Sequence, residues 1–386
     1  MDKRRIFSIL AIMFTATTLW AANLYVPQFE LVTRGFVNEE DDFELATRGD
    51  IKFLAEGGYK FGGKIMLGFS NDNLSVNTEE LDPDTAAPAD IVNYLNSVTP
   101  LYFKLASVTM RNLFSLPLNF TYFIGESDRF ATGDDFVTLF GTAPFASRYR
   151  GYLYFPETVQ YNGIHGVTGT GLAFNTTFDT TWNNTSLYAY QNSVLGSEAY
   201  SFDLRSLVNT EFFKMEAFAG ATIGPDTDNF GYYRAGLLLF LKAGETGEFF
   251  TQIGIPRWDP VDDPFDITLF YFLFEPRVKF DVLSIILTFF WHPSYYLDIQ
   301  TEESGSADMN LNFLFNDRED AVVKGGIETS VSFTNDESQN EFGIIASPYL
   351  TFVTSGVIWN IKVNTKLLPF ALDDMVEGFI GIKAEF

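Results

Sequence analysis

The sequence contains no cysteine among its 386 residues. This absence excludes disulfides, thiolate metal sites, a thiol nucleophile and the lipid-modified cysteine of a bacterial lipoprotein. Histidine is almost as scarce, because only His165 and His292 are present. The chain must therefore fold without covalent cross-links, and few imidazoles are available for general-base or metal chemistry.

Long hydrophobic runs are missing after residue 22. The longest extends over about ten residues, Val282 to Trp291, whereas a helix needs roughly 20 apolar residues to cross a bilayer. A tilted β-strand crosses in about 9 to 11 residues. Because backbone groups in hydrocarbon must be hydrogen-bonded internally, such a chain can cross a membrane only as a closed β-barrel.

Basic residues are also few, since acidic residues outnumber them 50 to 25 and the net charge is −25. Nucleic acids bind clustered Lys and Arg, so we expect no nucleic-acid partner. Aromatic residues are abundant, with 42 Phe and 18 Tyr, yet the mean hydropathy is only +0.04. A soluble domain would have to bury nearly all these rings, whereas a lipid-facing barrel places them outside.

The N-terminus has the organisation of a secretory signal peptide. Lys3, Arg4 and Arg5 precede an apolar stretch at 6–19. Cleavage is expected after Ala22, although the small residue usual three positions before the cut is missing. The predicted organisation is a signal peptide at 1–22 and one transmembrane barrel domain at 23–386.

Alternation of apolar and polar residues indicates strands with one apolar and one polar face. In one segment near the C-terminus, the residues expected to face lipid are Val357, Trp359, Ile361, Val363 and Leu367. The residues between them, expected to face the interior, are Asn360, Lys362, Asn364 and Lys366. A soluble sandwich would show the same alternation, so the other signals must decide for a membrane.

The predicted strands are connected alternately by long, mostly acidic segments and by short turns. The long segments are 38–42, 71–100, 125–165, 192–199, 222–231, 257–265, 293–308, 335–341 and 368–376. The short segments are 57–63, 112–115, 179–184, 209–210, 243–247, 281–282, 316–321 and 355–356. Together they predict about 18 strands, within a range of roughly 14 to 20, with long loops at one rim and short turns at the other.

The last predicted strand, 377–386, places Ile380, Ile382, Ala384 and Phe386 on one face. Here the sequence resembles outer-membrane β-barrel proteins of double-membraned bacteria, whose assembly machinery recognises an alternating final strand with a C-terminal aromatic residue. The architecture is porin-like, and the aromatic, acidic composition is similar to that of spirochaete barrels. The resemblance implies an all-β transmembrane antiparallel barrel in the outer membrane, with long acidic external loops, short periplasmic turns and Phe386 as assembly signal.

The resemblance also directs attention to the third external loop, 125–165, because the third loop of general porins folds into the lumen and narrows it. The residues that would form this constriction carry both signs of charge: Arg129, Arg148, Arg150, Glu126, Asp128, Asp134 and Asp135. Opposed charges across a narrow pore favour small polar solutes over apolar ones. An ordinary exposed loop is the alternative, because the assignment rests on ordinal position.

Alternation assigns further charged residues to the lumen wall, namely Lys52, Lys104, Lys214, Glu216, Lys324, Glu328, Lys362 and Lys366, joined by Lys279, Asp50, Glu56 and Glu275. This wall is of mixed charge, whereas the external loops are anionic. Anionic loops concentrate cations at the mouth within a Debye length of about 8 Å. The sequence therefore favours a preference for cations.

No catalytic motif is present: the sequence lacks both G-x-S-x-G and H-E-x-x-H. We expect no enzymatic activity, no cofactor and no metal. The run Asp259, Asp262, Asp263 and Asp266 is expected to be a solvated acidic loop, with loose calcium binding as the alternative. Trp258 and Trp291 fall where strands meet external loops, a position typical of rings at the membrane interface.

These observations favour a porin-like channel for passive diffusion of small polar solutes. Two alternatives remain open: an outer-membrane transporter of hydrophobic substrates, and a surface adhesion or structural barrel. The expected partners are the lipid bilayer, the barrel assembly machinery and small polar solutes, with a homo-oligomer left open.

Overall fold

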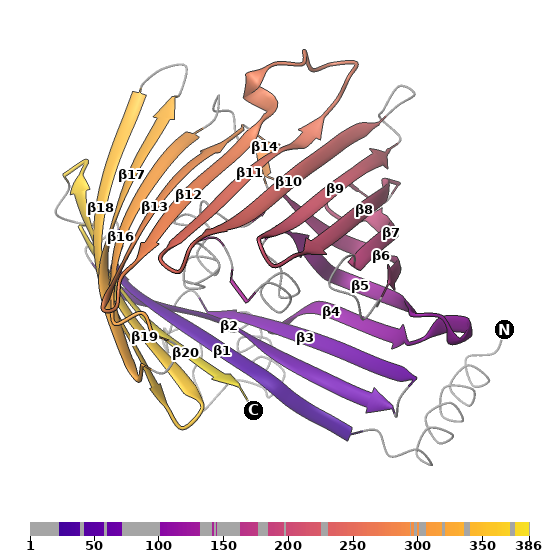
Figure 1. The fold of residues 1–386 in the computed structure, drawn as a ribbon, viewed down its shortest axis with the longest axis horizontal. Helices are drawn as coiled ribbons and strands as arrows, with labels where there is room; N and C mark the ends of the chain where they lie inside the picture. Colours follow the sequence, from indigo (N-terminus) through magenta and orange to yellow (C-terminus); the bar gives the residue numbers. More distant parts are fainter. Residues whose placement is uncertain are drawn as a thin grey trace, which may run out of the picture.

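A computed structural model of the chain shows a β-barrel (Figure 1). It describes residues 23–38, 42–57, 60–71, 101–131, 141–142, 144, 163–176, 184–196, 198–224, 231–293, 295–296, 299–300, 306–318, 321–335, 340–370 and 375–385. None of the helical segments in these ranges is long and apolar enough to span a membrane.

One sheet contains 18 of the strands. They are β1 Asn23–Val37, β2 Phe43–Gly57, β3 Phe61–Asn71, β4 Leu101–Met110, β5 Leu118–Phe130, β6 His165–Thr176, β7 Asn184–Asn192, β8 Tyr200–Asn209, β9 Phe213–Ile223, β10 Tyr232–Ala243, β11 Gly247–Trp258, β12 Tyr271–Lys279, β13 Leu283–His292, β16 Ser306–Phe315, β17 Val323–Asn335, β18 Asn340–Thr354, β19 Val357–Leu368 and β20 Val376–Glu385. Between β13 and β16, β14 Tyr295–Tyr296 pairs with β15 Ile299–Gln300, and two 3₁₀ turns occur at η2 Leu113–Ser115 and η4 Ile267–Leu269.

The sheet closes on itself. Each strand pairs antiparallel with the next, and the last strand, β20, returns to β1 with Phe29 opposite Ala384 and Leu31 opposite Ile382. Closure removes the unpaired edges that an open sheet would expose. The prediction of an all-β antiparallel barrel of about 18 strands is confirmed.

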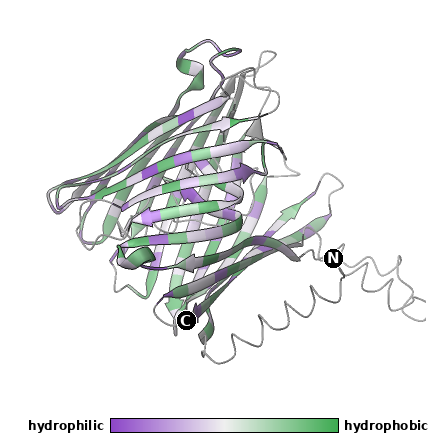
Figure 2. Cartoon of the chain, turned by 90° about the vertical axis from the view of Figure 1, so that its right-hand side faces the viewer, coloured by the Kyte–Doolittle hydropathy of each residue, from purple (hydrophilic) through white to green (hydrophobic). Residues whose placement is uncertain are grey.

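The two faces of the barrel differ in polarity as alternation predicted. In β19, Ile361 is 39% exposed on the outside, whereas its neighbour Lys362 is 8% exposed on the inside. The same contrast separates Ile327 from Glu328 in β17. Figure 2 shows polar and apolar residues alternating along the strands. On these strands the apolar side chains therefore lie on the outer surface, and the polar groups lie on the inner face.

The hairpin of β5 and β6 differs from the prediction, which had the third loop begin at 125. The strands remain paired as far as Phe130 and His165, so Glu126, Asp128 and Arg129 lie in a strand. Their charges interrupt the alternation, which is why the sequence suggested a loop. A β-bulge between Glu126 and Asp128 accounts for the interruption, because bulges bend a strand and redirect its side chains.

Two glycines lie at the point where this hairpin bends toward the inside of the barrel. Gly125 and Gly169 face each other in register, with φ of 101° and 156°. A side chain at either position would collide with a backbone carbonyl, that of Lys104 or Gln191. Only glycine fits both the backbone conformation and the close approach.

Beyond these glycines the hairpin packs against the inner wall of the barrel. Phe130 is fully buried, with its ring centroid 4.9 Å from that of Phe218 in β9. Ile164 occupies the space left by Gly236 in β10 and Gly254 in β11, because a Cβ at either glycine would crowd its side chain. A hydrophobic core thus forms inside the barrel between the hairpin and the wall.

Candidate functional site

The end of the β5–β6 hairpin, residues 126–131 and 163–168, is called the inner hairpin below. Its two faces have different surroundings. Asp128 and Phe130 point to the barrel wall and are buried. Glu126 and Arg129 form an ion pair of 2.5 Å, and their side chains are 35% and 29% exposed. The pair therefore lies on the solvent-accessible side of the inner hairpin.

A buried row of charges ties the inner hairpin to β7, β8 and β9. The Asp128 carboxylate accepts a hydrogen bond of 2.6 Å from the Tyr188 hydroxyl and an ion-pair contact from Arg205. Arg205 also donates from Nε to Glu216 at 2.8 Å. The same Glu216 carboxylate accepts the Ala131 backbone N–H at 2.8 Å. Arg205 thus lies between two carboxylates, one on the hairpin and one on the wall.

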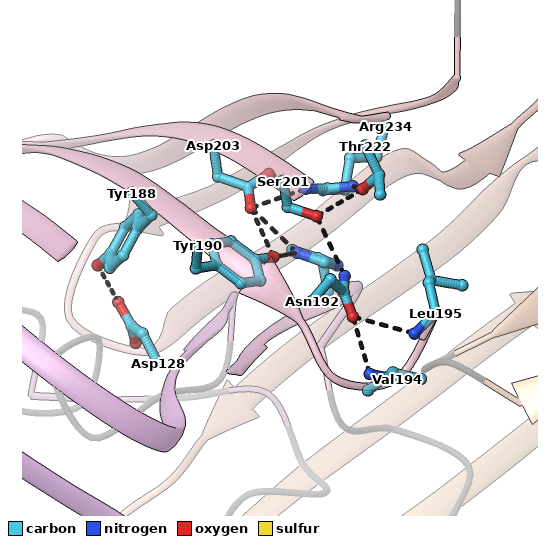
Figure 3. A network of polar contacts seen from close by, with 11 residues as sticks. Asp128, Tyr188, Tyr190, Asn192, Val194, Leu195, Ser201, Asp203, Thr222 and Arg234 are labelled. Carbon is cyan, nitrogen blue, oxygen red and sulfur yellow. Dashed lines mark hydrogen bonds and ion pairs between the residues drawn. The ribbon is translucent and has the colours of Figure 1, made fainter. Parts of the chain in front are cut away.

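A second buried network joins Tyr190, Asp203, Thr222 and Arg234 (Figure 3), and His165 of the inner hairpin contacts it. His165 Nε2 lies 3.0 Å from the Tyr190 hydroxyl oxygen and 3.3 Å from Asp203 Oδ2. Arg234 donates to both Asp203 oxygens, from Nε at 2.6 Å and from Nη2 at 2.8 Å. Arg234 Nη1 also donates to Thr222 at 2.6 Å. Polar networks satisfied in this way hold a single arrangement, and removing one member is costly.

The segment that follows β5 contacts the wall again further along the sheet. Arg277 of β12 donates from Nη1 to Thr142 Oγ1 at 3.0 Å. Arg277 is itself held by Glu275 and lies 4.4 Å from the centre of the Phe250 ring. The inner hairpin therefore contacts the inner faces of β7 to β9, and Thr142 contacts the inner face of β12.

The opposite part of the wall is formed by β1–β4 and β17–β20 and is called the basic wall below. Among the side chains that the structure describes there, the inward-facing cations outnumber the inward-facing anions. The cations are Arg34, Arg48, Lys52, Lys64, Lys104, Lys324, Lys362, Lys366 and Lys383, and the anions are Glu30, Glu44, Asp50, Glu56, Glu328 and Glu377. The Lys104 and Lys324 side chains are 22% and 27% exposed, so this wall has groups accessible to water.

Several of these charges form ion pairs between strands that are adjacent in the sheet or separated by one strand. Lys104 contacts Asp50 at 2.7 Å. Arg34 contacts Glu377 at 2.6 Å, and Lys362 contacts Glu328 deep in the wall. A register shift next to Lys104 in β4 allows this lysine to turn inward beside the buried Leu105.

The structure places the predicted site residues as follows. Glu126 and Arg129 face the accessible side of the inner hairpin, whereas Asp128 faces the wall. Glu216 is on the inward face, as predicted, but the inner hairpin covers it. Lys214 lies 5.9 Å from the Phe240 ring centre on the same face. Arg148, Arg150, Asp134, Asp135 and Phe386 lie outside the described residues, and so do residues 1–22 and the segment Tyr149–Phe155.

Sequence reasoning missed Asp203, Arg205 and Arg234. The signal was available for the first two, because Ser201, Asp203 and Arg205 alternate with Phe202 and Leu204 along β8. Alternation shows only that such residues point inward. It does not show which segment will cover them.

The aspartate run in the connection between β11 and β12 is engaged in local turns. Asp259 Oδ1 accepts the Val261 N–H at 2.9 Å, and Asp266 Oδ1 accepts the Thr268 N–H at 2.8 Å. The hydrogen bonds from Thr268 lower the pKa of Asp266. Within the described residues, no group of three or more His, Asp or Glu side chains is arranged to hold a metal ion.

Comparison with known proteins finds similarity in three-dimensional structure but none in sequence. No protein-family model matches the chain, and no curated protein matches it. OpdK of Pseudomonas aeruginosa, solved with vanillate, has a TM-score of 0.51 at 10% identity over 93% of this chain and 97% of its own. OccAB2 of Acinetobacter baumannii has a TM-score of 0.51 at 12% identity over 94% and 98%. The chain thus has the fold of bacterial outer-membrane channel barrels, as predicted.

Proposed function

We propose that this protein is an outer-membrane channel for passive diffusion of small polar solutes, which pass between the inner hairpin and the basic wall. The observation that carries the proposal is the closed 18-stranded barrel with partly exposed charges on its inner face. Barrels of about 16 to 18 strands are wide enough to enclose an aqueous channel. The fold shared with OpdK and OccAB2 supports this function and the outer-membrane location.

The inner hairpin is the element that narrows this passage. Its core against β7 to β11 fills one side of the barrel, and its Glu126–Arg129 pair faces the other side. Charges fixed on both sides of a water-filled passage favour solutes that can replace the hydrogen bonds of displaced water. Arg148, Arg150, Asp134 and Asp135 remain predicted contributors to this constriction.

The solute class that the described wall favours is anionic, in contrast to the preference for cations that the loops suggested. Charges on the basic wall lie along the passage itself, and the low-dielectric protein and lipid behind them focus their field into it. Loop charges at the mouth are screened by salt over about 8 Å. The vanillate in the OpdK structure is a carboxylate and supports the same class.

Recordings in planar bilayers under a KCl gradient test the channel and its selectivity together. We expect stepwise currents with a reversal potential that indicates a preference for chloride. The K52Q/K366Q double variant should shift the reversal potential toward potassium, since two wall cations are lost. An F53Q/L367Q double variant on the outer face serves as a control. Absence of current steps would refute the channel, and an unshifted potential in the lysine variant would refute the role of the basic wall.

A further inference from the structure

The connection between β11 and β12, residues 259–270, has large apolar side chains that are exposed to solvent. Val261, Phe265 and Ile267 are 61%, 61% and 64% exposed. A soluble rim would gain by turning such residues inward or by replacing them with polar ones. Their exposure indicates that something apolar covers this connection when the barrel is in place.

A continuous row of ring contacts joins this connection to the outer surface of the barrel. The ring centroids of Trp258 and Phe265 are 5.2 Å apart, those of Phe265 and Phe270 are 5.7 Å apart, and those of Phe270 and Phe272 are 5.8 Å apart. Phe272 faces outward on β12 opposite Trp291 of β13. The next outward residue along β12, Phe274, is 48% exposed. The exposed rings are therefore an extension of the surface that faces lipid.

The connection is held in this shape by its own hydrogen bonds. Asp263 N–H donates to the Asp259 carbonyl at 2.8 Å, and Trp258 Nε1 donates to the Asp263 carbonyl at 3.1 Å. Asp266 caps the η4 turn through Thr268. Because the conformation is fixed beforehand, contact with an apolar phase costs little ordering entropy.

Carboxylates lie between the apolar residues. Asp262 and Asp266 are exposed beside Val261, Phe265 and Ile267, and the hydrogen bonds from Thr268 lower the pKa of Asp266 and keep it ionised. An element that carries both exposed apolar side chains and charges suits the boundary between lipid headgroups and acyl chains. The continuity with the lipid-facing surface favours lipid over a soluble protein partner.

We propose that the β11–β12 connection inserts Val261, Phe265 and Ile267 into the headgroup–acyl boundary of the leaflet at this rim. The connection would then anchor one side of the barrel mouth to the membrane. This inference requires that the barrel crosses a bilayer, but it does not require that the barrel conducts.

Single-cysteine labelling tests the insertion, because the chain has no cysteine of its own. Phe265→Cys, Ile267→Cys and the control Asp262→Cys would each carry an environment-sensitive fluorophore in phosphatidylcholine vesicles. We expect a lipid-borne nitroxide placed near the headgroups to quench the labels at 265 and 267 several-fold more strongly than the label at 262. Aqueous iodide should show the reverse order.

A nitroxide-to-iodide quenching ratio at 265 and 267 no larger than the ratio at 262 would overturn the anchor. The use of two positions guards against one substitution disturbing the connection locally. Because the readout is depth and not current, it separates failure of the anchor from failure of the channel. Protection of 265 and 267 from both quenchers would also overturn the proposal, since it would indicate a protein cover.

Discussion

Replacing Arg205 by alanine is expected to change a steadily open channel into one that closes frequently, with the open fraction reduced several-fold. Without Arg205, Asp128 on the inner hairpin and Glu216 on the wall become two buried carboxylates without their shared cation. Removing one partner of a buried ion pair costs about 3–5 kcal/mol. The contact between hairpin and wall therefore weakens, and the hairpin can move into the passage that its docking leaves open.

Single-channel recording of the R205A variant at constant voltage measures this effect. Asp128→Asn should reduce the open fraction less than R205A does. In this variant Arg205 still forms its ion pair with Glu216, and the hairpin loses only one charge. Lys324→Ala removes a cation from the basic wall without touching the hairpin and should leave the open fraction unchanged. A steady R205A channel, indistinguishable from that of the K324A variant, would show that these contacts do not position the hairpin.

Replacing Lys362 by methionine is expected to destabilise the barrel by about 3–5 kcal/mol. Glu328 is fully buried in β17, and Lys362 reaches it from β19 across β18. Loss of the lysine leaves a buried carboxylate without its cation. The free energy of unfolding follows from urea titration of the protein refolded in lipid vesicles.

The double variant E328M/K362M separates loss of the pair from loss of packing. Replacing both members of a buried pair by apolar residues of similar volume is often neutral or stabilising. We therefore expect the double variant to recover most of the stability that K362M loses. Equal destabilisation in the single and double variants would mean that Lys362 acts through its alkyl chain and not through its charge.

The strands and their faces could be predicted because they depend on local pattern. A period of two places Lys362 and Ile361 on opposite faces whatever the rest of the chain does. Short connections that contain glycine end strands where they were expected, at 244–246 and 355–356. Closure of the sheet was expected because a membrane-crossing sheet can leave no edge unpaired.

The inner hairpin could not be predicted in the same way, because its position depends on partners distant in sequence. Asp128 meets Arg205 from 77 positions away, and Ala131 meets Glu216 from 85. Alternation predicted that the Glu216 side chain points into the barrel. It cannot distinguish an inward side chain that is exposed to water from one that another segment covers. Gly125 and Gly169 were the local signal for the bend, yet nothing adjacent in sequence indicates that they pair.

The orientation of residues across the β2 strand gives the most direct test of the channel. Single-cysteine variants Lys52→Cys and Phe53→Cys place a thiol on the inward and the outward face of neighbouring positions. A charged, membrane-impermeant thiosulfonate added during single-channel recording should change the current through the first variant and leave the second unaffected. A current changed by modification at 53 and unchanged by modification at 52 would contradict a polar, conducting interior.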